Sequence, residues 1–371
     1  MRIGIVAKAR TWLLIGLLCC TSLGLAQEKN PEQDPKNPEP TTNVEESIEA
    51  LFGPDEKEET TEEKPAGSQE PILYIADTDN GRIVVMQGLD GEGFTAVGMP
   101  GFGFGRFLRP AQVWVDFKRR LYVADSGNNR VIRLDQTSQQ GWTEIDDLSS
   151  PMGVAVDKSG VYIADTKADR VLLVEEVVEG AEIKEVLTPP TEGEKQLMSR
   201  PTTLWIDKEG ALYICCGEDP PGGRIFKTWK EKDRRRWKMF EGEGLAGSRF
   251  RPSSVVTIGG TLRLLDESGQ RIVTMQDMEG KRMKELNFRD DHRFRLSRPG
   301  GLAVDESGKR FFIADSGNDR ILEVRADGSI VREFTHMDDD PNSVLRNPTS
   351  IFVFSPAPGP EPESEEEEEE E

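Results

Sequence analysis

The sequence predicts an all-β fold, a six-bladed β-propeller whose ring is closed when the C-terminal strand joins the N-terminal blade. Three observations support this prediction. A short phrase, written LYVADSGNNR at 121–130 and FFIADSGNDR at 311–320, recurs six times. The copies fill 71–355 with a period of about 47 residues, which is typical of stacked supersecondary units. The first copy also lacks a segment that the end of the repeat region supplies.

Each repeat contains four segments of strand length. The first follows a proline and is rich in Val, Ile and Trp, as in RPAQVWVD. The second is the LYIAD phrase, and the third follows a tight turn rich in Gly, Asn and Asp. The fourth, such as IVREFT at 330–335, alternates more and should lie outermost. Because the body shows no helical periodicity, four strands repeated six times around an axis predict a propeller.

The two ends of the repeat region complete a single blade. The N-terminal unit begins with ILYIAD at 72–77 and has no proline segment before it. The proline segment NPTSIFVF at 347–354 has no second strand after it. We expect these two segments to pair, which would close the ring and leave no free sheet edge.

An Asp at the end of the second strand and an Arg at the start of the third recur in the repeats. Asp125 with Arg130 and Asp315 with Arg320 are two examples. Seen singly, such a pair could be catalytic, but its repetition around a ring favours a structural role. We expect a hairpin held by a carboxylate–guanidinium contact, with Asn or Gly at positive φ.

The combined pattern resembles the NHL-repeat family of β-propellers. It reads P-x-x-[apolar]-x-[apolar]-D, then [LV]-Y-[IV]-A-D-[ST]-x-N-x-R-[IV], and it covers nearly all of 71–354. The resemblance implies a six-bladed propeller. It also implies two classes of function, because such propellers include binding modules as well as lyases and lactonase-like hydrolases that act in the central channel.

The segments outside the repeats have other compositions. Residues 1–26 predict a signal peptide, with a basic start, a short apolar run, and Gly24 and Ala26 placed for cleavage. The run is too short to span a bilayer, so no membrane span is expected after cleavage; a retained anchor is the alternative. Residues 27–70, with 14 acids and four lysines, predict a disordered acidic linker, and 356–371, with nine glutamates, a disordered acidic tail. We expect a secreted or periplasmic monomer.

Motifs for catalysis are scarce. The chain has two histidines, His292 and His336, and no HExxH, GxSxG or P-loop sequence. We therefore expect no catalytic residues, no metal and no cofactor, and we favour a binding protein over an enzyme. A hydrolase or lyase acting at the channel mouth is the alternative. The body, 71–360, carries a net charge of only −5, which argues against nucleic acid as the partner.

Two adjacent cysteines, Cys215 and Cys216, occupy the Ala-Asp position of the fourth repeat. A disulfide between neighbours is disfavoured, because adjacent α-carbons are about 3.8 Å apart and neighbouring strand side chains point to opposite faces. We expect two buried free thiols.

Arginine directly precedes four of the six prolines that start the inner strands. These connections should lie on one face around the channel mouth, with each residue before proline held extended. Guanidinium groups bind carboxylates bidentately, so this face predicts a site for a protein or an anionic envelope polymer. The alternative is that each Arg pairs with an acid of a neighbouring blade. The predicted binding residues are Arg109, Arg200, Arg251 and Arg298.

Overall fold

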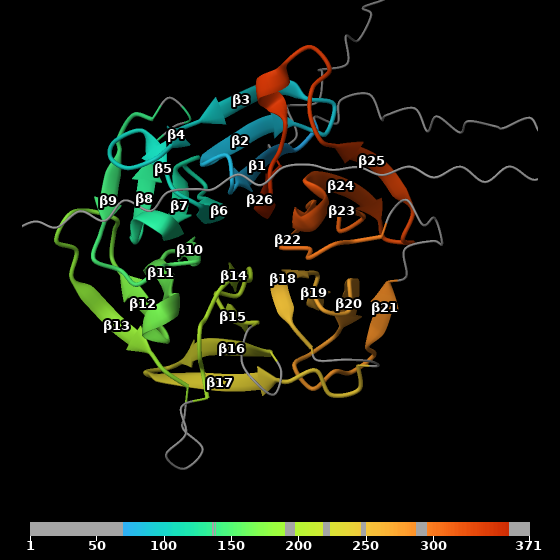
Figure 1. The fold of residues 1–371 in the computed structure, drawn as a ribbon. Helices are drawn as coiled ribbons and strands as arrows, with labels where there is room; N and C mark the ends of the chain where they lie inside the picture. The colour runs from blue at the N-terminus through green and yellow to red at the C-terminus, as the bar shows by residue number, and fades with distance from the viewer. Residues whose placement is uncertain are drawn as a thin grey trace, which may run out of the picture. The chain divides into compact units, whose positions relative to one another are not determined.

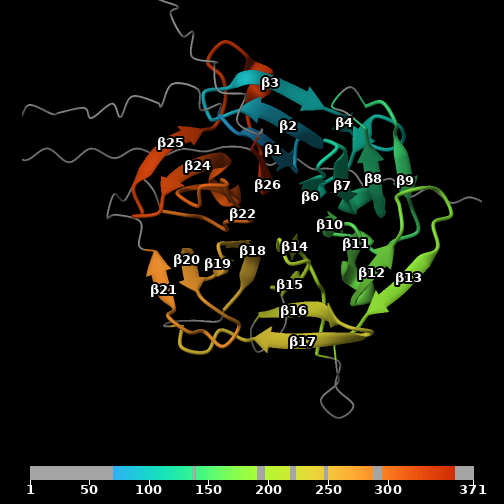
Figure 2. The ribbon, with the colours of Figure 1, turned by 180° about the vertical axis from the view of Figure 1, so that it is seen from behind.

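The computed structural model describes residues 70–355 apart from 136, 138, 190–196, 218–222, 246–249 and 287–294. The predicted signal peptide, the linker except for Glu70, the acidic tail and His292 lie outside these residues. Six four-stranded antiparallel sheets surround a common axis, which confirms the predicted all-β, six-bladed propeller (Figure 1). The view from behind shows the same order of blades in the opposite sense (Figure 2).

Apart from β26, the first three blades are built from the N-terminal half of the described chain. From the axis outward, blade 1 is β26 (Pro348–Phe354), β1 (Ile72–Asp77), β2 (Arg82–Gln87) and β3 (Glu92–Val97). Blade 2 is β6 (Pro110–Val115), β7 (Leu121–Asp125), β8 (Arg130–Leu134) and β9 (Thr143–Ile145). Blade 3 is β10 (Gly153–Asp157), β11 (Gly160–Asp165), β12 (Arg170–Val174) and β13 (Ile183–Leu187).

The other three blades follow the same order. Blade 4 is β14 (Leu204–Ile206), β15 (Leu212–Cys216), β16 (Arg224–Glu231) and β17 (Arg234–Phe240). Blade 5 is β18 (Pro252–Ile258), β19 (Thr261–Asp266), β20 (Arg271–Met275) and β21 (Lys284–Leu286). Blade 6 is β22 (Gly301–Val304), β23 (Arg310–Asp315), β24 (Arg320–Arg325) and β25 (Ile330–Phe334). A short parallel pair, β4 (Met99–Pro100) and β5 (Arg106–Phe107), lies between blades 1 and 2.

Helical structure is limited in the described ranges to short 3₁₀ turns, such as Ser126–Asn128 and Ser316–Asn318. None of the described residues forms a helix with the length and hydropathy of a membrane span.

The ring closes through blade 1, as predicted. β26 pairs with β1 in antiparallel register, with Ile72 opposite Phe354 and Ala76 opposite Ser350. The blade thus takes its inner strand from one end of the repeat region and its other three strands from the opposite end. Because β1 is paired on both sides, neither of its edges is free.

Burial follows position within a blade. All five residues of the second strand β7 are buried, because this strand is covered by the blades on both sides. The outer strand β17 alternates between exposed and half-buried residues, since one of its faces meets solvent. The predicted strand alternation therefore identified the outermost strands correctly.

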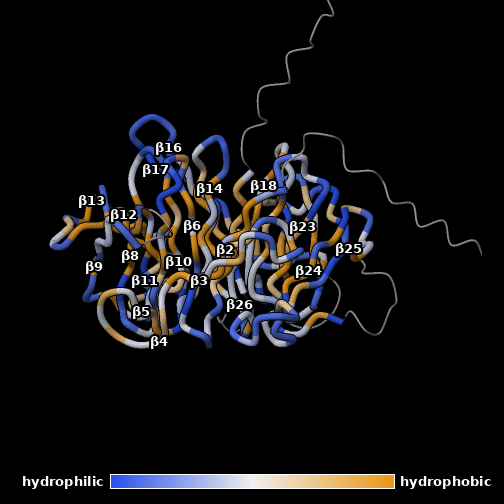
Figure 3. Tube along the Cα trace, turned by 90° about the horizontal axis from the view of Figure 1, so that it is seen from above, coloured by the Kyte–Doolittle hydropathy of each residue, from blue (hydrophilic) through white to orange (hydrophobic). Residues whose placement is uncertain are grey.

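The disc has two faces that differ in their loops. The Asp-turn face carries the turns between second and third strands and the connections into the next inner strand. The pocket face carries the turns between first and second strands and those between third and fourth strands. In the side view of Figure 3, β4 and β5 lie at the lower rim, on the Asp-turn face, away from the upper rim where β16 and β17 are labelled.

Candidate functional site

The repeated Asp and Arg form buried structural contacts, as predicted. Asp125 is fully buried; its Oδ2 accepts hydrogen bonds from Arg130 Nε at 2.9 Å and Asn128 Nδ2 at 2.7 Å. Its Oδ1 accepts the Leu108 amide at 2.7 Å. Burial raises the pKa of Asp125, although these three donors oppose the shift. The same Asp–Arg contact, at 2.7–3.1 Å, joins Asp77 to Arg82, Asp165 to Arg170, Asp266 to Arg271 and Asp315 to Arg320.

Two further positions of the turn hold the next blade. The hydroxyl after the Asp donates to the carbonyl of the next blade's proline, at 2.7 Å from Thr78 to Pro110 and at 2.6 Å from Ser316 to Pro348. The last turn residue has a left-handed backbone, with φ near 53–55° at Asn129, Asp169 and Asp319. Its side chain accepts the amide of the residue before that proline, at 2.6 Å between Asp169 and Arg200.

The four predicted binding arginines all lie on the Asp-turn face, at connections between blades. The expectation that a residue before proline is extended is wrong at three of them. Arg109, Arg200 and Arg298 have φ values of 53°, 45° and 44°, in the left-handed region. The cause is the contact with the preceding blade, because the amide of Arg200 must turn toward the carboxylate of Asp169.

The side chains of these arginines fall into two groups. Arg251 is half-buried; it lies 3.5 Å from the Glu267 carboxylate and donates to the Gly217 carbonyl at 3.2 Å. Arg109, Arg200 and Arg298 are exposed and lie at alternate connections of the ring. No hydrogen bond or ion pair joins the side chain of Arg109 or Arg298 to another residue that the structure describes. Pairing with a neighbouring acid is therefore seen for Arg251.

An exposed aromatic loop lies on the same face, between blades 1 and 2. The side chains of Phe102 and Phe104 are 73% and 71% exposed. Gly101, Gly103 and Gly105 alternate with them and all have positive φ, which turns the two phenylalanines outward.

Blade 2 fixes this aromatic loop. Arg130 donates to the carbonyls of Gly103 and Arg106 at 2.9 and 2.7 Å. Asn128 donates to the Gly101 carbonyl at 3.0 Å. The ring of Phe104 contacts Trp142, with centroids 5.0 Å apart. The loop is thus ordered by the same turn residues that hold the blade together.

The central channel is closed by side chains of the inner strands. Gln112 is buried and crosses between strands, donating to the Leu204 carbonyl at 2.8 Å and accepting the Val154 amide at 3.1 Å. Trp114 contacts both Trp205 and Phe352, with ring centroids 5.4 and 5.1 Å away. A cavity lined by these inner strands has a volume of about 20 Å³, close to the space of one water molecule.

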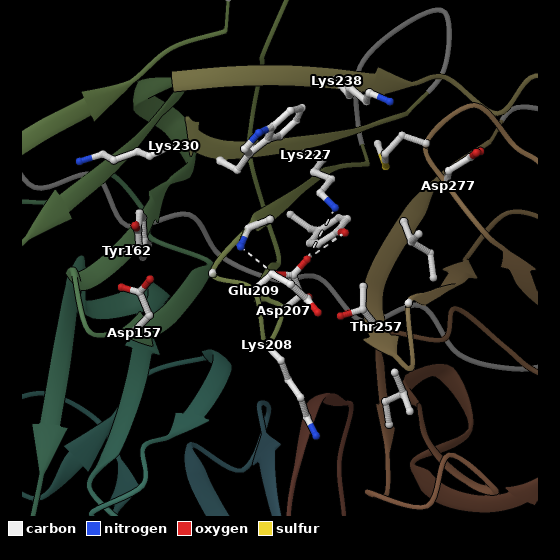
Figure 4. A pocket seen from close by; sticks show the side chains of 18 of the residues that line it. Asp157, Tyr162, Asp207, Lys208, Glu209, Lys227, Lys230, Lys238, Thr257 and Asp277 are labelled. Carbon is white, nitrogen blue, oxygen red and sulfur yellow. Dashed lines mark hydrogen bonds and ion pairs between the residues drawn. The ribbon is translucent and has the colours of Figure 1, made fainter. Parts of the chain in front are cut away.

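A pocket of about 900 Å³ lies on the pocket face between blades 3, 4 and 5. In Figure 4, Asp157 lies on the blade 3 side and Thr257 on the blade 5 side, with Asp207 between them. Asp207 accepts the Ala211 amide at 2.7 Å and the Tyr213 hydroxyl at 3.2 Å. Burial, followed by the Asp207 charge, raises the pKa of Tyr213 well above its ordinary range.

Side chains that bind metal ions are not clustered at the described parts of the central channel or the pocket. Among the residues that the structure describes, no group of three or more His, Cys, Asp or Glu side chains could hold a metal ion.

Comparisons with known proteins identify the class of fold. No protein-family model and no curated protein matches the chain. The structure of a nidogen/laminin complex is similar, with a TM-score of 0.57 and 16% identity over 76% of this chain and 98% of that one. A Bacteroides caccae protein of unknown function has a TM-score of 0.56 and 11% identity, over 77% of this chain and 100% of that one. A streptogramin B lyase has a TM-score of 0.50 and 13% identity, over 74% of this chain and 84% of that one. The chain is a six-bladed β-propeller.

Two features were missed by reasoning from sequence. The aromatic loop has a visible signal, because glycine alternates with phenylalanine in GFGFG at 101–105. The pocket has only a partial signal, because DKSG at 157–160 and DKEG at 207–210 both line it, whereas the rest of its lining comes from strands and a blade 5 turn that share no motif.

Proposed function

We propose that this chain is an exported binding protein of the NHL-repeat type that recognises a partner protein through its Asp-turn face. The observation that carries this proposal is the combination of the exposed, ordered aromatic loop with the arginines on one face. Arg and aromatic residues are enriched in protein interfaces and contribute most of their binding energy. A loop that is already ordered loses little entropy on binding, which favours affinity.

The arginines suggest the chemistry of the partner surface. Exposed guanidinium groups at alternate connections suit carboxylates, which Arg binds bidentately. An anionic envelope polymer would offer the same groups, but the two exposed phenylalanines favour a protein with an apolar patch beside its acids. The nidogen/laminin structure, by its name a complex of two proteins, gives a fold likeness that is compatible with this role.

The enzyme alternative is less well supported. A hydrolase or lyase at the channel mouth requires space for a substrate and convergent polar groups. The cavity beside Gln112 and the Trp114 ring holds about 20 Å³, so a substrate would have to bind outside the channel, in the 900 Å³ pocket of blades 3, 4 and 5. The similarity to a streptogramin B lyase, at 13% identity, is a similarity of fold alone.

The proposal is tested by quantitative affinity capture from an envelope extract. We expect Phe102→Ser with Phe104→Ser to lose at least about tenfold of the captured partner, because each removes an exposed apolar contact worth more than 1 kcal/mol in an interface. Phe117→Ser is the matched control. Phe117 is 83% exposed and lies on the pocket face, so capture by this variant should be unchanged.

Charge reversal tests the arginines separately. Arg109→Glu with Arg298→Glu should abolish capture without changing the melting temperature, while Lys118→Glu on the pocket face should retain it. Intact capture by the double variant, or a melting temperature lowered by several degrees, would remove the arginines from the site.

A further inference from the structure

The pocket between blades 3, 4 and 5 has an excess of basic side chains. Four acidic side chains line it, from Asp157, Asp207, Glu209 and Asp277. Six basic side chains line it, from Lys158, Lys208, Lys227, Lys230, Arg235 and Lys238. The lining residues therefore sum to a formal charge of +2, although three of these cations pair with Glu185 and Glu279, which do not line the pocket.

Much of the charge of both signs is already used by the protein, including that of four of the six basic side chains, from Lys227, Lys230, Arg235 and Lys238. Asp207 accepts hydrogen bonds within its own turn and lies 3.6 Å from Lys227 Nζ. Asp277 lies 3.0 Å from Lys281. By contrast, Lys158 and Lys208 are exposed, and neither forms an ion pair with any residue that the structure describes. In Figure 4, Lys208 extends away from the other labelled side chains.

The strand that leads into the glutamate run ends on this same face. β26 runs antiparallel to β1 and ends at Phe354, opposite Ile72. Arg119, in the pocket-face turn of blade 2, lies 5.1 Å above the Phe354 ring, which places the end of β26 on the pocket face near the axis. Nine glutamates follow within 361–371.

The glutamate run can reach the pocket. Eleven residues separate Phe354 from Glu365 and can span at most about 35–40 Å. The segment must cross the axis from blade 1, but it need not reach an outer strand, because Lys208 lies in the turn directly after the inner strand β14. Because the segment is tethered, its effective concentration at the pocket is in the millimolar range, so that even weak binding would fill the site.

We propose that this pocket binds glutamate-rich acidic peptide, and that the chain's own segment 361–371 is its occupant. The contacts are between carboxylates and the ammonium groups of Lys158 and Lys208 at the pocket opening. This inference does not depend on the function proposed above, because the pocket and the Asp-turn face are on opposite sides of the disc.

The first test measures lysine acetylation rates by mass spectrometry in the full chain. A variant with the nine glutamates of 361–371 replaced by glutamine is the comparison. At low ionic strength, Lys158 and Lys208 should react about fivefold more slowly in the wild type, and the difference should vanish at about 0.5 M salt. Lys167, which is exposed on the Asp-turn face, is the control and should react equally in both.

The acidic segment 27–69 is the competing occupant, since Glu70 leads into β1 on the same face. If the glutamine variant keeps the protection of Lys158 and Lys208, the glutamate run is not the occupant and the proposal is wrong. The same conclusion holds if the wild type shows no protection.

The second test adds a fluorescent peptide of sequence 361–371 to the glutamine variant and follows its anisotropy. The peptide should bind, and Lys158→Glu with Lys208→Glu in that background should weaken binding at least tenfold. Lys167→Glu should leave binding unchanged. Equal affinity in all three backgrounds would overturn the assignment of the pocket.

Discussion

At the scale of single residues, the repeated turn connects each blade to two neighbours. Its Asp holds the segment that enters its own blade, as Asp125 holds the Leu108 amide. Its hydroxyl and its left-handed residue hold the segment that enters the next blade. The phrase is therefore repeated because each blade junction needs the same set of donors and acceptors.

Removing one of these aspartates should be costly. Asp125→Ala leaves the Arg130 Nε, the Asn128 amide and the Leu108 amide without their acceptor in a buried site. We expect a loss of about 3 kcal/mol in the free energy of unfolding, measured by urea titration. Asp125→Asn keeps an acceptor for the Leu108 amide and should lose less. A loss below about 1 kcal/mol for the alanine variant would contradict a structural role.

The fourth blade lacks the aspartate, and its thiols are buried instead. Cys215 and Cys216 are both free and fully buried, as predicted. They contact different clusters on the two faces of β15, and burial raises the pKa of the Cys215 thiol. Arg224 pairs with Glu241 at 2.6 Å, which replaces the missing carboxylate.

This burial predicts the reactivity of the thiols. An alkylating reagent should label Cys215 and Cys216 slowly in the native protein, because a protonated, inaccessible thiol is a poor nucleophile. Both should be labelled within minutes in non-reducing denaturant, as measured by mass spectrometry. An unlabelled mass two hydrogens lighter would show a disulfide between them.

At the scale of strands, adjacent outer strands are joined by ion pairs. Glu185 on β13 accepts two hydrogen bonds from Arg235 on β17, both at 2.7 Å, which links blades 3 and 4. The pKa of Glu185 is lowered from its ordinary value of 4.5, and the largest cause is the hydrogen bond from Arg235. A carboxyl group whose pKa is lowered on folding stabilises the folded state at pH values above its pKa in the unfolded chain. This stabilisation is lost as the pH falls through its pKa in the folded state.

The stability difference between wild type and Glu185→Gln should therefore depend on pH. We expect the wild type to be more stable by about 0.5–1 kcal/mol at pH 7 and pH 5, since the pair is partly exposed. The difference should shrink as pH falls below the ordinary carboxyl pKa of 4.5, and it should close as pH passes through the lowered pKa of Glu185 in the folded state. Glu175→Gln, which alters an 80% exposed carboxylate in the same blade, is the control. A difference that is constant down to pH 3 would disagree with the assigned ion pair.

Strands and turns were predictable where they recur, and single side chains were not. The second strands, the Asp–Arg contacts and the pairing of 347–354 with 72–77 follow from copies of one pattern. The left-handed φ of Arg200 depends on a hydrogen bond to Asp169, 31 residues earlier, which no local rule for proline contains. The pocket combines turns from three blades, so its lining could be identified only once the blades were placed.

At the scale of the whole molecule, both ends of the repeat region hold the ring shut. Glu70, which the sequence assigned to the linker, is bound to Arg310 at 2.7 Å and to Arg332 at 3.2 Å. Both arginines also contact Glu323, which is buried in blade 6. The propeller body therefore begins at Glu70, one residue earlier than the pattern of the repeats indicates.

Removal of β26 should open this ring. A chain that ends at Arg346 loses the inner strand of blade 1, so β1 is left with one unpaired edge. It also loses the Thr349 hydroxyl contacts to the Ala111 carbonyl and to Thr78, at 3.0 and 2.6 Å, and the acceptor for Ser316. We expect the urea midpoint to fall steeply, or the cooperative transition to be lost, because no single blade buries its inner face alone. A chain that begins at Glu70 and ends at Ser355 is the control and should unfold at the wild-type midpoint. An unchanged midpoint for the chain ending at Arg346 would show that closure of the ring does not stabilise the propeller.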